Sequence, residues 1–184
     1  MFQFAFCTGM RPSEYIAQAW PNVNYVMHHL HVAGAFVDGE AKTSANTEAG
    51  LRKIHMRHGA LEALKAQQVH TKLAGQLIFL NPTYGKQWAG DKPIRERWGR
   101  ILLTAGVRNR NPYQTRHTYA SRLLTLGANP PYVSTQLGHV DTPLVFRTYG
   151  GWIAAGLNND KRQRLLRLYL RNDVDAPNEF PRFG

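Results

Sequence analysis

Apolar residues recur at helical spacing over most of the second half of the chain. Helices are expected there at residues 91–104, 113–126, 129–138 and 142–150. Each segment ends at or shortly before a glycine, and the last two carry proline in their first turn, where the missing N–H has no partner to lose. The second half is therefore expected to be mainly helical.

The first half mixes helical and strand-like patterns. Helices are predicted at residues 1–8, 11–20 and 59–69. Partial alternation of apolar and polar residues at 29–37 and 51–56 predicts two strand segments joined by a polar connection. The predicted fold class is therefore α+β, mainly α with a small antiparallel β-sheet.

Length and composition indicate one folded domain. The chain has 184 residues, the size of a single domain, and its 43% apolar content excludes a disordered basic tail. No apolar run reaches the ~18 residues that a membrane span needs. The single cysteine, Cys7, excludes an internal disulfide framework and favours a reducing compartment.

The charge is strongly basic and unevenly distributed. Lys and Arg number 23 against 12 Asp and Glu, a formal net charge of +11. Seven arginines lie between Arg95 and Arg122, with Glu96 as the one acid among them. Because the guanidinium fork binds phosphate at two points, a polyanion is the expected partner. The alternative for part of this cluster is that the arginines only solvate exposed helix faces.

The sequence lacks the motifs of nucleotide-binding and zinc enzymes. It has no Walker-type glycine loop, no paired-cysteine motif and no H-E-x-x-H, and its acids are spread thinly. A phosphodiester would then be cut without a metal, which requires cationic donors, a nucleophile and a proton donor for the leaving oxygen. Residues suited to these roles stand at predicted helix ends: Arg11, Arg116, His139 and Tyr149.

Five short pieces follow one another along residues 1–150: Thr8-Gly9-Met10-Arg11-Pro12-Ser13-Glu14, Lys42-Thr43, Tyr113-x-x-Arg116-His117-Thr118, Leu137-Gly138-His139 and Tyr149. Their order resembles that of the tyrosine recombinases, also called phage-type integrases. Each piece alone is a weak signal, whereas all of them in this order make a strong one. The resemblance implies the catalytic-domain fold of that family.

The resemblance also implies a metal-free strand exchange on duplex DNA that uses no cofactor. By position, Tyr149 would attack the scissile phosphate and form a 3′-phosphotyrosyl bond, while Arg11 and Arg116 would clamp the phosphate. Lys42 would protonate the leaving 5′-oxygen, and His139 would hydrogen-bond the phosphate or assist proton transfer. A phenol, whose pKa is about 10, needs nearby positive charge or a proton acceptor to react at neutral pH.

One position departs from the family pattern, because Tyr113 stands where a histidine is usual. A phenol donates a hydrogen bond but carries no positive charge near neutral pH, so activity with some loss of phosphate stabilisation is expected. Three further residues are expected to support the site or contact DNA: Glu14, Thr43 and His117. Glu14 would orient Arg11 or serve as a first-turn acid, and His117 is interpreted as a packed or hydrogen-bonded structural residue.

The resemblance sets expectations for organisation and partners. We expect one catalytic domain over residues 1–184, with the catalytic core at about 1–150 and a C-terminal helix and tail at 151–184. Because the chain begins within a helix, N-terminal DNA-binding domains are expected to precede it in the natural protein. The implied partner is duplex DNA with specific recombination sites, bound by a homotetramer in the synaptic complex, and a monomer remains open for the chain without DNA. The implied location is the cytoplasm of a bacterial or phage-infected cell.

Two other functions remain open from the sequence. The presence of Tyr113 is compatible with a catalytically inactive module that binds duplex DNA in a salt-sensitive way and forms no covalent product. A type IB topoisomerase-like enzyme would use the same tyrosine and arginines to relax supercoils instead of recombining two sites.

Overall fold

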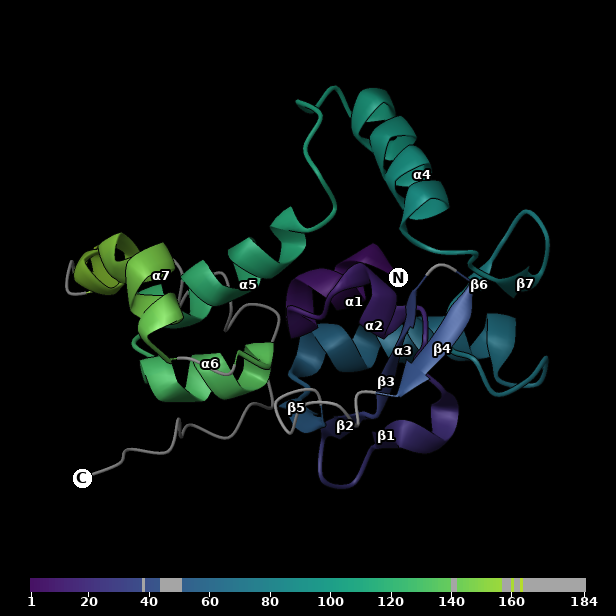
Figure 1. The fold of residues 1–184 in the computed structure, drawn as a ribbon, viewed down its shortest axis with the longest axis horizontal. Helices are drawn as coiled ribbons and strands as arrows, with labels where there is room; N and C mark the ends of the chain where they lie inside the picture. Colours follow the sequence, from purple (N-terminus) through teal and green to yellow (C-terminus); the bar gives the residue numbers. More distant parts are fainter. Residues whose placement is uncertain (38, 44–50, 140–141, 157–159, 161–162, 164–184) are drawn as a thin grey trace.

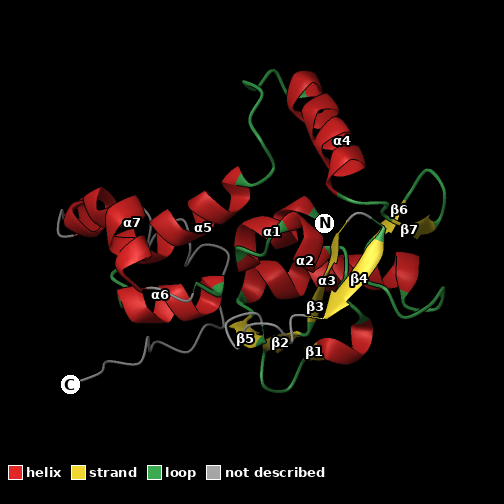
Figure 2. Cartoon of the chain, viewed as in Figure 1, coloured by secondary structure: helices red, strands yellow, loops and turns green. Residues whose placement is uncertain are grey.

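The computed structural model describes residues 1–37, 39–43, 51–139, 142–156, 160 and 163. Its helices are α1 Phe2–Thr8, α2 Pro12–Tyr15, α3 His58–Thr71, α4 Asp91–Thr104, α5 Gln114–Thr125, α6 Pro130–Leu137 and α7 Thr142–Gly156. Its strands are β1 Val23–Asn24, β2 His29–Val32, β3 Gly34–Val37, β4 Glu40–Thr43, β5 Arg52–His55, β6 Leu80–Asn81 and β7 Lys86–Gln87. Helix dominates the cartoon in Figure 2, which confirms the predicted fold class.

Two predictions concern the chain ends and the membrane. The predicted tail beyond α7 lies outside the described residues, apart from residues 160 and 163. Among the described helices, none combines the length and the apolar character that crossing a membrane requires.

The strands form three small antiparallel sheets, where the sequence predicted one. β2 pairs with β1 on one side and β5 on the other, whereas β3 and β4 form a separate hairpin and β6 and β7 another. The predicted strand segment 29–37 is thus divided at Ala33 between two sheets, and the polar connection after it supplies β4. The alternation of apolar and polar residues indicates which face of a strand is buried, but it does not indicate where the strand changes its pairing partner.

The second predicted helix is much shorter than expected, since α2 ends at Tyr15 and not at residue 20. Beyond it the chain makes a turn at residues 16–17, pairs with a distant segment through a bridge between Ala19 and Leu77, and then forms the short 3-10 helix η1 Trp20–Asn22. The Ile78 N–H donates to the Gln18 carbonyl at 2.9 Å, and the Trp20 N–H donates to the Gln76 carbonyl at 2.8 Å. Tertiary pairing therefore overrides the local helical pattern there.

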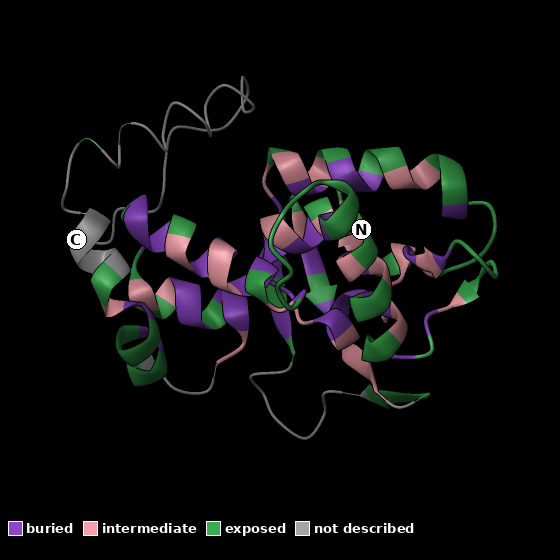
Figure 3. Cartoon of the chain, turned by 90° about the horizontal axis from the view of Figure 1, so that it is seen from above, coloured by how far each residue is buried: buried purple, intermediate pink, exposed green. Residues whose placement is uncertain are grey.

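Buried apolar side chains gather in two separate clusters. The first core contains residues of α1, α2, α3, β2, β5 and the start of α4, from Phe4 to Ile94. The second core contains residues of α5, α6 and α7, from Tyr119 to Tyr149. In Figure 1 the two groups of elements lie side by side along the longest axis, and Figure 3 shows buried residues in both. Contacts of α1 with α5 and of β5 with α6 join them.

Gly9 shapes the junction between the two cores. It closes α1 in the left-handed conformation, with φ +64°, which glycine adopts without strain. A Cβ atom at this position would lie only 2.4 Å from Cδ1 of Tyr119 on α5. The absence of a side chain therefore allows the end of α1 to approach α5 closely, which also brings the Gly9 carbonyl to Arg116.

Candidate active site

Arg11 stands at the entrance of α2, held by the acid three residues later. Its backbone N–H donates to Oε2 of Glu14 at 2.8 Å, and its Nη1 donates to Oε1 at 2.7 Å. The guanidinium of Arg11 is about one third exposed, whereas Glu14 is buried. Proline at position 12 fixes the first turn, so the Arg11 side chain leaves the helix entrance in a defined direction. The expectation that Glu14 orients Arg11 fits this geometry.

A second arginine, the buried Arg52, binds the same Glu14 carboxylate. Its Nη1 and Nη2 donate to the two Glu14 oxygens at 3.1 and 2.8 Å, and its Nε donates to the Gln136 carbonyl at 2.9 Å. Burial raises the pKa of the Glu14 carboxyl, but Arg52 and then Arg11 lower it more strongly, to about 2. Glu14 is therefore a carboxylate at neutral pH, locked between two guanidinium groups.

Sequence reasoning missed Arg52, although a signal was available. Arg52 alternates with Ile54 and Met56, which are both buried, so the strand register turns all three side chains to the same inner face. A charge on the buried face of a strand requires a partner. Glu14 and Gln136 provide it from α2 and α6.

Arg116 lies at the centre of the site, with only 1% of its surface exposed. Its Nη1 donates to the Gly9 carbonyl at 2.8 Å, and its Nη2 donates to the Leu137 carbonyl. Burial lowers the pKa of Arg116 to about 10, with a further contribution from the charge of Arg11. Arg116 therefore remains a cation at neutral pH and connects the end of α1 with the end of α6.

His139 follows α6 directly and faces the same cationic group. Gly138 closes the helix with φ +63°, and its carbonyl lies 3.5 Å from Nη2 of Arg11. Burial lowers the pKa of His139 to about 4, assisted by the charges of Arg116, Arg11 and Arg52. The buried Nδ1 of His139 has no hydrogen-bond partner among the described residues. His139 is thus a neutral imidazole next to a cluster of arginines.

Tyr149 approaches this group from α7. The side chain is 4% exposed, and its Oη lies 2.7 Å from Nδ1 of His117. Burial raises the pKa of the Tyr149 phenol above its usual value, and the charge of Arg116 opposes this effect. The charge of Arg116 acts on both the imidazole and the phenol, so the three side chains form one group. His117 was expected to be a packed or hydrogen-bonded structural residue. In the structure its imidazole lies within hydrogen-bond distance of the candidate nucleophile.

A family comparison decides the identity of this arrangement. The model of the phage integrase family matches residues 1–150. The chain belongs to the phage integrase family. The matched range contains all five motif pieces, from the Thr8 piece to Tyr149, and also the side chains of the site described above.

Relatives of this phage integrase family member include an integrase and a tyrosine recombinase. The chain is 32% identical over 178 residues to the prophage integrase IntR of Escherichia coli, covering 83% of this chain and 43% of IntR. It is 26% identical to the tyrosine recombinase XerC of Staphylococcus haemolyticus, covering 97% of this chain and 54% of XerC. The chain therefore spans about half the length of these relatives.

A solved structure shows the same fold. The integrase of transposon Tn1549, solved in complex with circular intermediate DNA, superposes with a TM-score of 0.72 at 19% identity, over 80% of this chain and 53% of that one. This agreement confirms the predicted catalytic-domain fold of the tyrosine recombinases.

The remaining family positions lie at the edge of the cluster. Lys42 is exposed on β4, opposite Ala35 of β3, and no hydrogen bond or ion pair joins it to the other described site residues. Thr43 follows it at the end of the strand. The Tyr113 ring stands under Arg116, whose Cζ lies 5.9 Å from its centroid. The structure thus gathers Arg11, Tyr113, Arg116, His139 and Tyr149 and leaves the lysine on a neighbouring hairpin.

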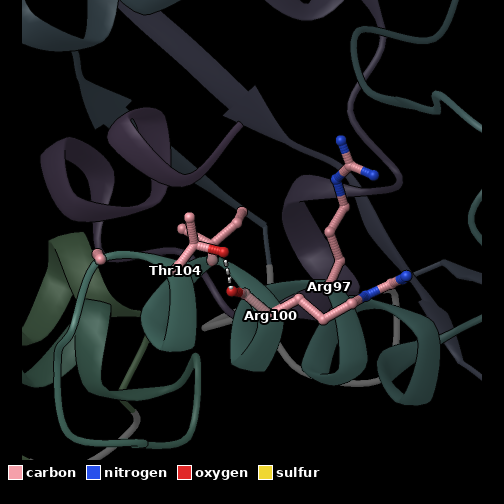
Figure 4. Close-up of a pocket in the computed structure, with 5 residues that line it drawn as sticks. Arg97, Arg100 and Thr104 are labelled. Atoms are coloured by element: carbon pink, nitrogen blue, oxygen red, sulfur yellow. Dashed lines mark hydrogen bonds between the residues drawn. The ribbon is translucent and has the colours of Figure 1, made fainter.

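A second feature of the chain lies outside the cluster. A surface depression on α4 is lined by Arg97, Arg100, Ile101, Thr104 and Ala105. In Figure 4 the two arginine side chains extend from one side of the helix, and the Thr104 hydroxyl donates to the Arg100 carbonyl at 3.0 Å. None of the predicted catalytic residues lines this depression, so it is described separately from the site.

Proposed function

We propose that this chain breaks and rejoins DNA strands at specific sites through a 3′-phosphotyrosyl intermediate. The observation that carries the proposal is the convergence of Tyr149 with Arg116 and Arg11, from three separate parts of one chain. A nucleophilic hydroxyl beside fixed cations is the arrangement that phosphoryl transfer requires.

The two arginines would bind the scissile phosphate. Arg116 is held by two backbone carbonyls and Arg11 by Glu14, so both guanidinium groups are positioned before DNA arrives. Such preorganised donors stabilise the charge that develops on the non-bridging oxygens without further rearrangement. Arg116 remains charged at neutral pH although it is buried, because its pKa is about 10.

Lys42 would protonate the leaving 5′-oxygen, and His139 would hydrogen-bond the phosphate. The hairpin that carries Lys42 packs through β3 against α2, the helix that begins at Arg11. The lysine therefore stands on an element adjoining the phosphate site, and DNA bound there would lie between them. The neutral His139 has a buried Nδ1 that no described residue hydrogen-bonds, which suits it to a phosphate oxygen if that nitrogen carries the proton.

The partner would be duplex DNA, two sites of which are recombined by four copies of the chain. The formal charge of +11 favours a polyanion. The Tn1549 integrase, which has this fold, was solved with DNA. For recombination, strands of two duplexes must be exchanged, which requires a nucleophile at each of four cleavage points.

A covalent-capture experiment tests the proposal. The full chain is incubated in EDTA with a pool of nicked duplexes whose central region is randomised, and DNA that remains attached to protein after SDS is recovered and sequenced. We expect an adduct at a recurrent sequence, and Tyr149→Phe should abolish it. Tyr84→Phe is the matched control, because Tyr84 is 73% exposed and belongs to the turn between β6 and β7.

Three outcomes would contradict the proposal. Salt-sensitive duplex binding without any adduct would identify an inactive DNA-binding module. An adduct that persists in Tyr149→Phe would show that another residue is the nucleophile. An adduct that leads to supercoil relaxation but not to recombination of two captured sites would identify a topoisomerase-like enzyme.

A further inference from the structure

The closest polar contact of the candidate nucleophile is with a histidine that the sequence did not mark as catalytic. Nδ1 of His117 lies 2.7 Å from Oη of Tyr149, within hydrogen-bond distance, and the ring centroids are 5.7 Å apart. Two hydrogen-bond directions are compatible with this distance. If Nε2 carries the imidazole proton, Nδ1 accepts the hydrogen bond from the phenol.

The surroundings of His117 favour its neutral form. Burial and the adjacent positive charge of Arg116 lower the pKa of His117. The other titratable groups around it are Tyr113 on the preceding turn, whose ring is 5.4 Å away, Tyr149 on α7 and His139 after α6. None of these supplies a negative charge near neutral pH, so no anion in the described part of the chain keeps the imidazole protonated.

Tyr149 needs a proton acceptor, because its environment does not ionise it. Burial raises the pKa of the phenol, and the charge of Arg116 offsets this only in part. The other candidate acceptors nearby are poor bases. The pKa of His139 is lowered to about 4, and that of Glu14 to about 2, and both Glu14 oxygens are bound by arginines.

We propose that His117 is the general base that takes the proton of Tyr149 as its oxygen attacks the scissile phosphate. This inference rests on the proposed function. The Oη–P bond forms while the bond from phosphorus to the 5′-oxygen breaks, and the phenolic proton moves to Nδ1 of His117. The leaving oxygen takes its proton from the acid, here assigned to Lys42. In religation the imidazolium returns the proton to the departing phenolate, so no co-reactant is consumed.

The position of His117 explains how the site works with Tyr113 in place of the usual histidine. Residues 113 and 117 are one helical turn apart and share a face of α5. The imidazole is therefore present in the same pocket, one turn further along the helix and next to the nucleophile.

The first measurement compares variants on the captured sequence under single-turnover conditions. His117→Asn retains a hydrogen-bonding side chain but cannot accept the proton at neutral pH, so the rate of adduct formation should fall by roughly 10²- to 10⁴-fold. The matched control is His70→Asn, because His70 is an exposed residue of α3 and its rate should not change.

The pH dependence separates a base from a packing residue. With His117 present, the rate should rise with pH and reach a plateau near neutrality, because the imidazole acts in its unprotonated form. In His117→Asn the rate should continue to rise into the alkaline range, where the phenol ionises without help. A purely structural role predicts profiles of the same shape and different height.

Fluorotyrosine at position 149 provides a test that does not depend on the folding of the histidine variant. Fluorination lowers the pKa of the phenol. With His117 present, the midpoint of the pH profile should stay where it is, because it belongs to the imidazole. In His117→Asn the midpoint should move down with that of the phenol, and the rate at neutral pH should recover in part.

The outcomes distinguish this inference from the proposed function. If the unmodified chain forms a Tyr149-dependent adduct but His117→Asn has the same rate and profile, the general-base role is overturned and the proposed function stands. A midpoint that follows the phenol in the presence of His117 also overturns the role. If the unmodified chain forms no adduct, both proposals fail.

Discussion

The first core contributes to the site through paired charges, whereas the second core contributes neutral rings. Glu14 and Arg52 on the first side are buried and ion-paired, and they hold Arg11 at its position. On the second side His117 and Tyr149 form a neutral hydrogen-bonded pair. The difference separates two requirements of the chemistry. The phosphate needs fixed positive charge, and the nucleophile needs a group that can change its protonation state.

Arg116 belongs to the second side but bonds to both, so its loss should have the largest effect. Arg116→Met removes a cation from the phosphate site, and we expect adduct formation to slow by roughly 10³-fold, about 4 kcal/mol. It also leaves the Gly9 and Leu137 carbonyls without a donor, which should lower the free energy of unfolding by about 1–3 kcal/mol.

Arg122→Met serves as the control for this change, because Arg122 is an exposed residue of the same helix. Both the cleavage rate on captured DNA and the urea denaturation curve are measured. Equal rate losses in the two variants would mean that Arg116 contributes general positive charge and no specific stabilisation of the scissile phosphate.

The ion pair of the first side is tested by Glu14→Gln. This change leaves the buried Arg52 guanidinium without a counter-charge, so we expect a loss of about 3–5 kcal/mol of unfolding free energy. Adding Arg52→Met should restore part of the loss, because the uncompensated charge is then gone. If urea denaturation shows that the two changes have additive effects on the free energy of unfolding, Glu14 and Arg52 are not energetically coupled. The first side would then not be distinguished from the second by paired charges.

The sequence predicted much of this site, and the exceptions have a common cause. Arg11, Arg116 and His139 were marked because they stand at or near helix ends, where local signals are strong. Tyr149 was placed at a predicted helix end as well, but α7 continues to Gly156, so this residue lies in the middle of the helix. The contact between His117 and Tyr149 depends on how α5 packs against α7, and no spacing along the chain encodes that distance.

The same contrast between local signals and contacts with distant segments applies to the prediction of the fold. The ends of α3 to α6 lie within two residues of their predicted positions, because caps and periodicity are local. The premature end of α2 and the division of the segment 29–37 between two sheets are set by pairing with distant backbone. Arg52 belongs to this group as well, because its partners Glu14 and Gln136 come from other elements.

The contact between the two sides is tested by Gly9→Ala. The left-handed conformation alone should cost about 1–2 kcal/mol, and the new Cβ would also lie 2.4 Å from the Tyr119 ring. We expect a total loss of about 3 kcal/mol in unfolding free energy, with slower adduct formation because the Gly9 carbonyl moves from Arg116. Gly106→Ala is the control, since Gly106 also has φ +64° but open space around it. Equal losses in both variants would mean that α1 and α5 can separate without cost.

Acidification is expected to have the smallest effect on the free energy of unfolding. The two sides should lose stability in different pH ranges. The folded-state pKa of His139 is lowered from 6.5 to about 4, so protonation favours the unfolded chain and stability should fall as the pH drops through that range. The folded-state pKa of Glu14 is lowered from 4.5 to about 2. Its contribution is therefore present above pH 4.5 and lost only as the pH falls toward 2.

Urea denaturation midpoints measured against pH should show both steps, with His139→Asn removing the higher one and Glu14→Gln the lower one. If His139→Asn removes neither step, the neutral state of the second side does not contribute to folding, and the distinction between paired charges and neutral rings applies to the chemistry alone.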